Sequence, residues 1–174
     1  MDGRQHFDLV KAAIPPCYAS VVSGEHYVRN GRVYERLLES ILRVALPDEE
    51  ITHPPPLITV PREAGGGGYL QPDLQIGDRT FVEVTAWADS NMVFSKIMQG
   101  LLVKRRVPFA RYFVVVADLG LDAGWSYDDE RLWEDWGQVG GVKAVDGWYG
   151  FANVEALVAA IKQGVQSFRG PGAG

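Results

Sequence analysis

The chain has 174 residues, a net charge of −5, and 47% hydrophobic and 22% charged residues, which is typical of one globular domain. The single cysteine, Cys17, excludes an internal disulfide framework and a zinc site built from cysteine pairs. No apolar run is long enough to span a bilayer and the N-terminus has no apolar leader core, so we expect a cytoplasmic protein without a membrane partner.

The first half of the chain predicts a short helix, a longer amphipathic helix and a strand. Residues 7–14 form a short apolar segment that ends at two prolines. Residues 32–46 carry apolar side chains every three or four positions and predict a helix that ends at Pro47. Residues 47–56 are rich in turn residues and end in three prolines, so we expect a connection there. Residues 57–60 then form a short strand candidate.

A hairpin is predicted where apolar strands at 69–76 and 80–86 flank the pair Gly77-Asp78. Counting back from this turn makes Asp73 and Glu83 near neighbours across the ladder, where opposed side chains lie about 4.5–5.5 Å apart. Two such carboxylates repel unless a cation lies between them, and Mg²⁺ is held by one or two carboxylates plus substrate phosphate oxygens. The alternative, that Glu83 simply faces water, stays open.

The spacing around this hairpin resembles the PD-(D/E)XK nuclease superfamily, whose signature is Pro-Asp, a short hairpin, then an acidic residue, any residue and Lys. Here Pro72-Asp73 is followed after nine residues by Glu83-Val84-Thr85, with Thr85 in place of the Lys. Residues 31–35, Gly-Arg-Val-Tyr-Glu, are similar to the opening of the first helix in that superfamily. The resemblance implies Mg²⁺, for which Mn²⁺ substitutes, at Asp73, Glu83, the backbone carbonyl of Val84 and Glu35.

The missing lysine leaves three alternatives. Some members of the superfamily carry the catalytic Lys on the helix after the hairpin, which is predicted here at residues 91–106, so Lys96 is the candidate replacement. Lys96 lies away from the expected apolar stripe, which favours an ordinary surface lysine. That stripe consists of Phe94, Ile97, Met98, Leu101 and Leu102. Otherwise a second metal ion, helped by Glu35, replaces the lysine, or the protein binds nucleic acid without cutting it.

The remaining elements complete a mixed α/β fold. Residues 111–117 are continuously apolar, which predicts a strand buried on both faces, reached by a right-handed crossover. The order from residue 31 to 118 is helix, three strands, helix, strand, which is the αβββαβ core of the resembled superfamily. We expect the acidic and aromatic segment 118–150, with helical turns at 131–136, to pack over the end of the sheet or to contact a partner. A C-terminal helix follows at 154–168.

The expected function is that of a metal-dependent endonuclease on duplex DNA. A basic face at Lys104, Arg105 and Arg106 serves the phosphate backbone although the total charge is negative. A compact domain spanning residues 1–174 suits a type II restriction-like enzyme acting as a homodimer in a restriction system. The alternatives are a structure-specific nuclease such as a Holliday-junction resolvase, and a catalytically degenerate module for nucleic-acid binding or assembly.

Overall fold

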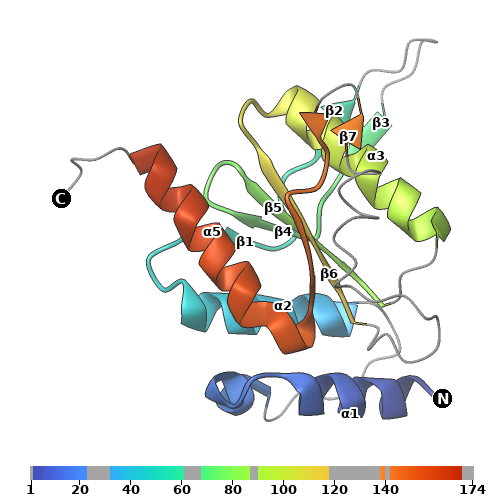
Figure 1. The fold of residues 1–174 in the computed structure, drawn as a ribbon, viewed down its shortest axis with the longest axis vertical. Helices are drawn as coiled ribbons and strands as arrows, with labels where there is room; N and C mark the ends of the chain where they lie inside the picture. Colours follow the sequence, from blue (N-terminus) through green and yellow to red (C-terminus); the bar gives the residue numbers. More distant parts are fainter. Residues whose placement is uncertain are drawn as a thin grey trace.

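A five-stranded mixed sheet forms the centre of the computed structural model, which describes residues 2–22, 32–60, 68–86, 90–117, 138–139 and 142–169 (Figure 1). The strand order is β1-β4-β5-β6-β9. The first three strands are antiparallel, whereas β5, β6 and β9 run parallel to one another. Their bounds are Ile51–Thr52 (β1), Leu74–Ile76 (β4), Thr80–Thr85 (β5), Arg111–Val116 (β6) and Gly147–Gly150 (β9). The predicted mixed α/β class is therefore confirmed.

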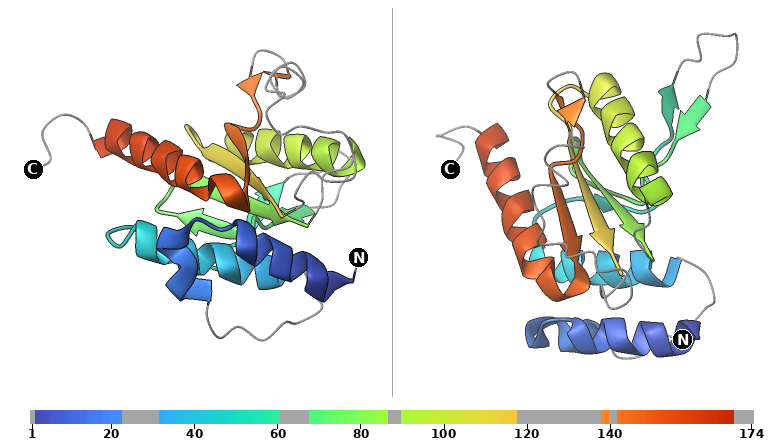
Figure 2. Two further views of the ribbon diagram at one scale, coloured as in Figure 1. Left: turned by 60° about the horizontal axis from the view of Figure 1, so that its bottom comes forward. Right: turned by 45° about the vertical axis from the view of Figure 1, so that its right-hand side comes forward.

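Helices cover both faces of this sheet. Helix α3 (Ser90–Arg106) lies on one face, and α2 (Arg32–Ala45) and α5 (Val154–Arg169) pack on the other. Helix α1 (Gly3–Ala13) lies outside α2 (Figure 1, Figure 2). The short elements are the 3-10 helices η1 (Pro16–Val22) and η2 (Phe151–Asn153) and the hairpin strands β7 (Gln138–Val139) and β8 (Val142–Lys143).

The sequence predicted most of the helices closely. The helices expected at 32–46, 91–106 and 154–168 and the strand at 111–117 are confirmed to within about two residues. The first helix begins earlier than predicted, because Asp2 caps it. The Asp2 carboxylate accepts a hydrogen bond from the Gln5 N–H, and the Gln5 side chain accepts one from the Asp2 N–H.

The prediction of one continuous strand at 69–76 is wrong. Residues Gly68–Leu70 form β3, which pairs with β2 (Ile58–Val60) in a separate ribbon that projects beside α3 (Figure 2). Pro72 separates β3 from β4, since proline has no N–H to donate to a ladder. The first strand of the central sheet is instead β1, within the segment predicted to be a connection.

The predicted apolar stripe of α3 is wrong in part. Ile97 is buried and Leu101 packs against the core as predicted, but Phe94 and Met98 are each 54% exposed, and Val93 and Val103 are buried instead. Gly100 lies on this inward side, where a Cβ atom would overlap the carbonyl oxygen of Ala144. The helix therefore packs closely against the rest of the chain at its glycine, and its buried face is rotated toward Lys96.

Strand β9 was not predicted. It extends the parallel part of the sheet beyond β6, so the end of segment 118–150 supplies an edge strand. The helical turns expected at 131–136 lie outside the described residues. In the described part of the chain, no helix combines the length and the apolar character needed to cross a membrane.

Candidate active site

Asp73 and Glu83 lie side by side where the hairpin of β4 and β5 opens. The ladder pairs Leu74 with Val82 and Ile76 with Thr80, around a turn at residues 77–79 in which Gly77 has a φ of 55°. The Asp73 N–H donates to Glu83 Oε2 (3.3 Å), and the Val84 N–H donates to Asp73 Oδ2 (2.7 Å). The structure thus places the two carboxylates next to each other, as predicted, although the turn has three residues and not the two that the prediction assumed.

The backbone of Val84 faces the same space as Asp73. In an extended strand, the N–H and C=O of one residue leave by the same edge. The Thr85 carbonyl accepts from the Ala117 N–H (2.7 Å) at the β6 edge, so its neighbour Val84 presents both groups to the β4 edge. The Val84 carbonyl is therefore available beside Asp73, as the resemblance implies for a metal ligand.

Lys96 reaches these carboxylates from α3. Side chains alternate along β5, so Val82 joins the core beneath α2 and α5, while Phe81 and Glu83 face α3. Lys96 Nζ lies 2.5 Å from Glu83 Oε1, and the Lys96 and Glu83 side chains are 14% and 7% exposed. The alternatives of a surface lysine and a solvated Glu83 are both wrong. Thr85 lies on the same face of β5 as Glu83 and is half-buried.

We call Asp73, Glu83 and Lys96 the Asp73 cluster, and this cluster has less positive than negative charge. Burial and then the charge of Glu83 raise the pKa of Asp73 from 3.8 to about 7, and Glu35 adds to this. Burial also raises the pKa of Glu83, although Lys96 opposes the shift. A single ammonium group thus serves the buried Glu83 and the half-buried Asp73, with Glu35 as a third acid nearby.

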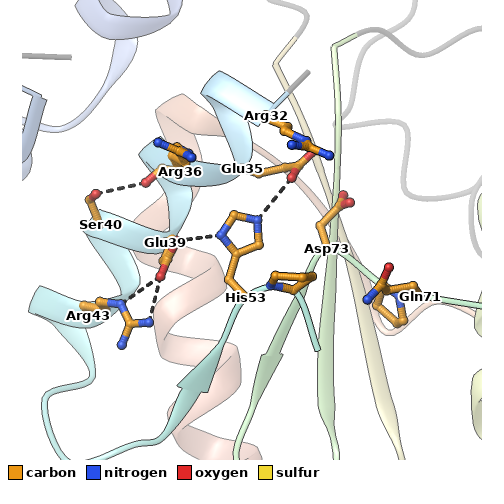
Figure 3. Close-up of a pocket in the computed structure, with 11 residues that line it drawn as sticks. Arg32, Glu35, Arg36, Glu39, Ser40, Arg43, His53, Gln71 and Asp73 are labelled. Atoms are coloured by element: carbon orange, nitrogen blue, oxygen red, sulfur yellow. Dashed lines mark hydrogen bonds and ion pairs between the residues drawn. The ribbon is translucent and has the colours of Figure 1, made fainter. Parts of the chain in front are cut away.

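A cavity of about 710 Å³ extends from Asp73 along α2. Figure 3 shows Arg32, Glu35 and Asp73 at one end of it. Glu35 Oε2 lies 3.2 Å from His53 Nε2, so the structure holds Glu35 beside the Asp73 cluster through His53.

A second group of charged residues lies further along this cavity. Glu39 Oε2 is 2.6 Å from His53 Nδ1, and its other oxygen is 2.7 Å from the Arg43 guanidinium. Burial would raise the pKa of Glu39, but Arg43 and His53 together hold it below its usual value. We call Glu39, His53 and Arg43 the Glu39 cluster. His53 was not predicted as a site residue, because strand β1, which directly precedes it and brings it beside α2, was not predicted.

The predicted basic face is not near the carboxylates. Lys104 follows Lys96 by eight residues on α3, about 12 Å along the helix axis. Its ammonium group donates to Asp146 Oδ1 (2.9 Å) and to the Lys143 carbonyl (2.6 Å). Arg105 and Arg106 are exposed at the end of the same helix. A role for these three residues in nucleic-acid binding stays a prediction.

The donor atoms at the Asp73 cluster fit a hard divalent cation. Two carboxylates and a backbone carbonyl meet there, and Mg²⁺ prefers such oxygen ligands. Across the described residues, however, no three His, Cys, Asp or Glu side chains are grouped as ligands of one metal ion, and Glu35 is bonded to His53 instead. Comparison of the chain with protein-family models and with curated proteins gave no match. The geometry of this cluster is therefore the basis for a functional assignment.

Proposed function

We propose that the protein is a metal-dependent nuclease that hydrolyses phosphodiester bonds in DNA, acting as a homodimer of the restriction-endonuclease type. The observation that carries this proposal is the ion pair of Lys96 with Glu83 beside Asp73. Two acids and a lysine converge from β4, β5 and α3, although Thr85 occupies the position of the motif lysine. Two neighbouring carboxylates of raised pKa are typical of a catalytic site.

The order of elements supports the same proposal. Without the β2–β3 ribbon, the chain runs α2, β1, β4, β5, α3, β6, with the first three strands antiparallel and the fourth parallel to its neighbour. This order is that of the αβββαβ core implied by the sequence resemblance. The ribbon is then an insertion between the first two strands of that core.

The residues of the site have distinct parts in the proposed reaction. Asp73, Glu83 and the Val84 carbonyl would hold Mg²⁺, which when bound supplies a water of lowered pKa and neutralises phosphate charge. Lys96 carries the positive charge closest to Glu83, and an ammonium group there can stabilise negative charge that develops on the phosphate oxygens. Glu83 orients Lys96 through their ion pair, so Glu83 would act both as a ligand of the metal ion and as the residue that positions Lys96.

The test is cleavage of plasmid DNA and of a four-way junction with Mg²⁺, with Mn²⁺ and with chelator. We expect metal-dependent cleavage by the wild type and a loss of at least about 10²-fold in Asp73→Asn and in Lys96→Gln. Asp78→Asn and Lys162→Gln are matched controls, because both residues are exposed and outside the cavity lining. We expect these controls to cleave like the wild type.

Each outcome bears on a different part of the proposal. Discrete plasmid fragments support a sequence-specific enzyme, whereas cleavage of the junction alone supports a resolvase. Cleavage that persists in Asp73→Asn, or in chelator, contradicts the assigned site. Absence of cleavage in every substrate contradicts nuclease activity and favours a binding module.

A further inference from the structure

Two arginines on α2 line the cavity beside the Asp73 cluster. Arg32 and Arg36 are one helical turn apart and both are exposed (Figure 3). Residues with this spacing have Cβ atoms about 5–6 Å apart, so their guanidinium groups can reach one common anion. Arg32 lies at the end of the cavity that also holds Glu35 and Asp73.

The acids on this helix already have other partners. Glu39 is bonded to Arg43 and His53, and Glu35 is bonded to His53. Among the residues that the structure describes, no ion pair joins Arg32 or Arg36 to an acid. The cavity therefore presents two positive charges without an acidic partner from the described residues.

Helix stability explains these arginines only in part, because the acids three residues after each of them, Glu35 and Glu39, are bonded to His53. Arg32 is the first residue of α2, where the helix dipole disfavours a positive charge. Like charges at positions four apart also repel each other. Both costs disappear when an anion lies between the two side chains, and guanidinium groups bind phosphate through paired hydrogen bonds.

We infer that Arg32 and Arg36 bind a phosphate group of the substrate strand next to the phosphate that is cleaved. This inference rests on the proposed nuclease function and names the path of the polynucleotide. The strand runs along α2 in the cavity, with one phosphate at the Asp73 cluster and its neighbour at the arginine pair. Gln71 and Pro72 form the opposite wall, and Gln71 is fixed by donating to the Pro55 carbonyl (2.8 Å).

The first experiment measures binding of a short fluorescein-labelled DNA duplex by anisotropy over a salt titration, in chelator so that nothing is cut. It compares the wild type with Arg32→Gln/Arg36→Gln and with the control Arg4→Gln/Lys162→Gln. The control removes the same charge from exposed sites on α1 and α5, outside the cavity lining. We expect the Arg32/Arg36 variant to bind about tenfold or more weakly at low salt. The slope of log affinity against log salt should fall by about 0.9, the value for one phosphate contact, while the control keeps the wild-type slope.

The second experiment uses inorganic pyrophosphate as a probe that does not depend on nuclease activity. We expect pyrophosphate to raise the thermal midpoint of the wild type and of the control, but not of the Arg32/Arg36 variant. Equal salt slopes in both double variants, or equal thermal shifts, would overturn the phosphate site and leave the nuclease proposal standing. A wild type that responds to pyrophosphate through these arginines but neither binds nor cuts DNA would instead overturn the nuclease proposal.

Discussion

The Asp73 cluster, whose Asp73 lines the cavity, and the Glu39 cluster further along it differ in how their charge is balanced. In the Glu39 cluster one carboxylate has Arg43 and His53 as partners, and its pKa is lowered although it is partly buried. In the Asp73 cluster Lys96 faces two carboxylates, and the pKa of Asp73 is raised to about 7. Deeper burial therefore coincides with the poorer charge balance.

This contrast separates a group that supports the fold from a group that costs stability. A carboxylate with an arginine and a histidine as partners is satisfied by the protein itself. A buried pair of acids with one lysine lowers the stability of the folded state, and such groups are concentrated at functional sites. The comparison can be tested by removing one partner at a time from each cluster.

The largest effect should come from Lys96→Met, which keeps the aliphatic stem and removes the charge. Glu83 would then be buried without its partner, and we expect the free energy of unfolding at pH 8 to fall by about 3–5 kcal/mol. The measurement is urea denaturation, with Glu83→Gln/Lys96→Met as the matched variant. We expect the double variant to recover most of the loss. A loss below about 1 kcal/mol in Lys96→Met would contradict the ion pair.

The next effect has the opposite sign and depends on pH. The folded-state pKa of Asp73 is above its ordinary value, so its contribution to stability is present below about pH 4 and is lost as the pH rises through about 7. Asp73→Asn removes this loss and can still accept from the Val84 N–H. At about 1.4 kcal/mol per pKa unit, we expect a gain of about 2–4 kcal/mol at pH 8 that vanishes near pH 4.

Denaturation of Asp73→Asn across this pH range provides the measurement. Asp78→Asn, in the exposed turn of the same hairpin, is the control and should show no such pH dependence. A gain that is the same at pH 4 and pH 8 would show that Asp73 is not the group that titrates.

The smallest effect should come from the Glu39 cluster. Arg43 is 52% exposed and pairs with Glu39 one turn away, so Arg43→Ala should cost about 0.5–1 kcal/mol. The cost should shrink with added salt, because exposed pairs are screened. Arg4→Ala on α1 is the control. A loss as large as that in Lys96→Met would remove the contrast between the two clusters.

The sequence predicted that Asp73 and Glu83 are near neighbours because a short turn limits the register of a hairpin. The exact register did not follow: a two-residue turn at Gly77-Asp78 would place Asp73 opposite Val82, whereas the observed turn at 77–79 aligns Asp73 with Glu83. The side of α3 that faces the sheet did not follow, because Phe94 and Met98 are apolar but exposed. Gly100 has no side chain to contribute to an apolar pattern, yet it lies on the buried side of α3, where a Cβ atom would overlap the Ala144 carbonyl oxygen.

The sequence did not predict the contacts between the cavity residues, for a different reason. Strand β1 has two residues and lies beside a run of prolines, so no alternation of side chains reveals it. The polar side of α2 was visible as Arg32, Arg36, Glu39 and Arg43 at spacings of three and four. Their partners were not visible, because His53 reaches them only through the tertiary fold.

The β4–β5 hairpin also bears on the order in which the chain folds. Its two strands close a turn of a few residues, and hairpins of this kind form in about 1–10 μs. Strand β9 instead pairs Gly147 with Phe113, which requires closure of a much longer loop. We therefore expect Asp73 and Glu83 to meet early, while the sheet edge is still open. Amide exchange during refolding should then protect Val84 before Trp148, whose N–H faces β6.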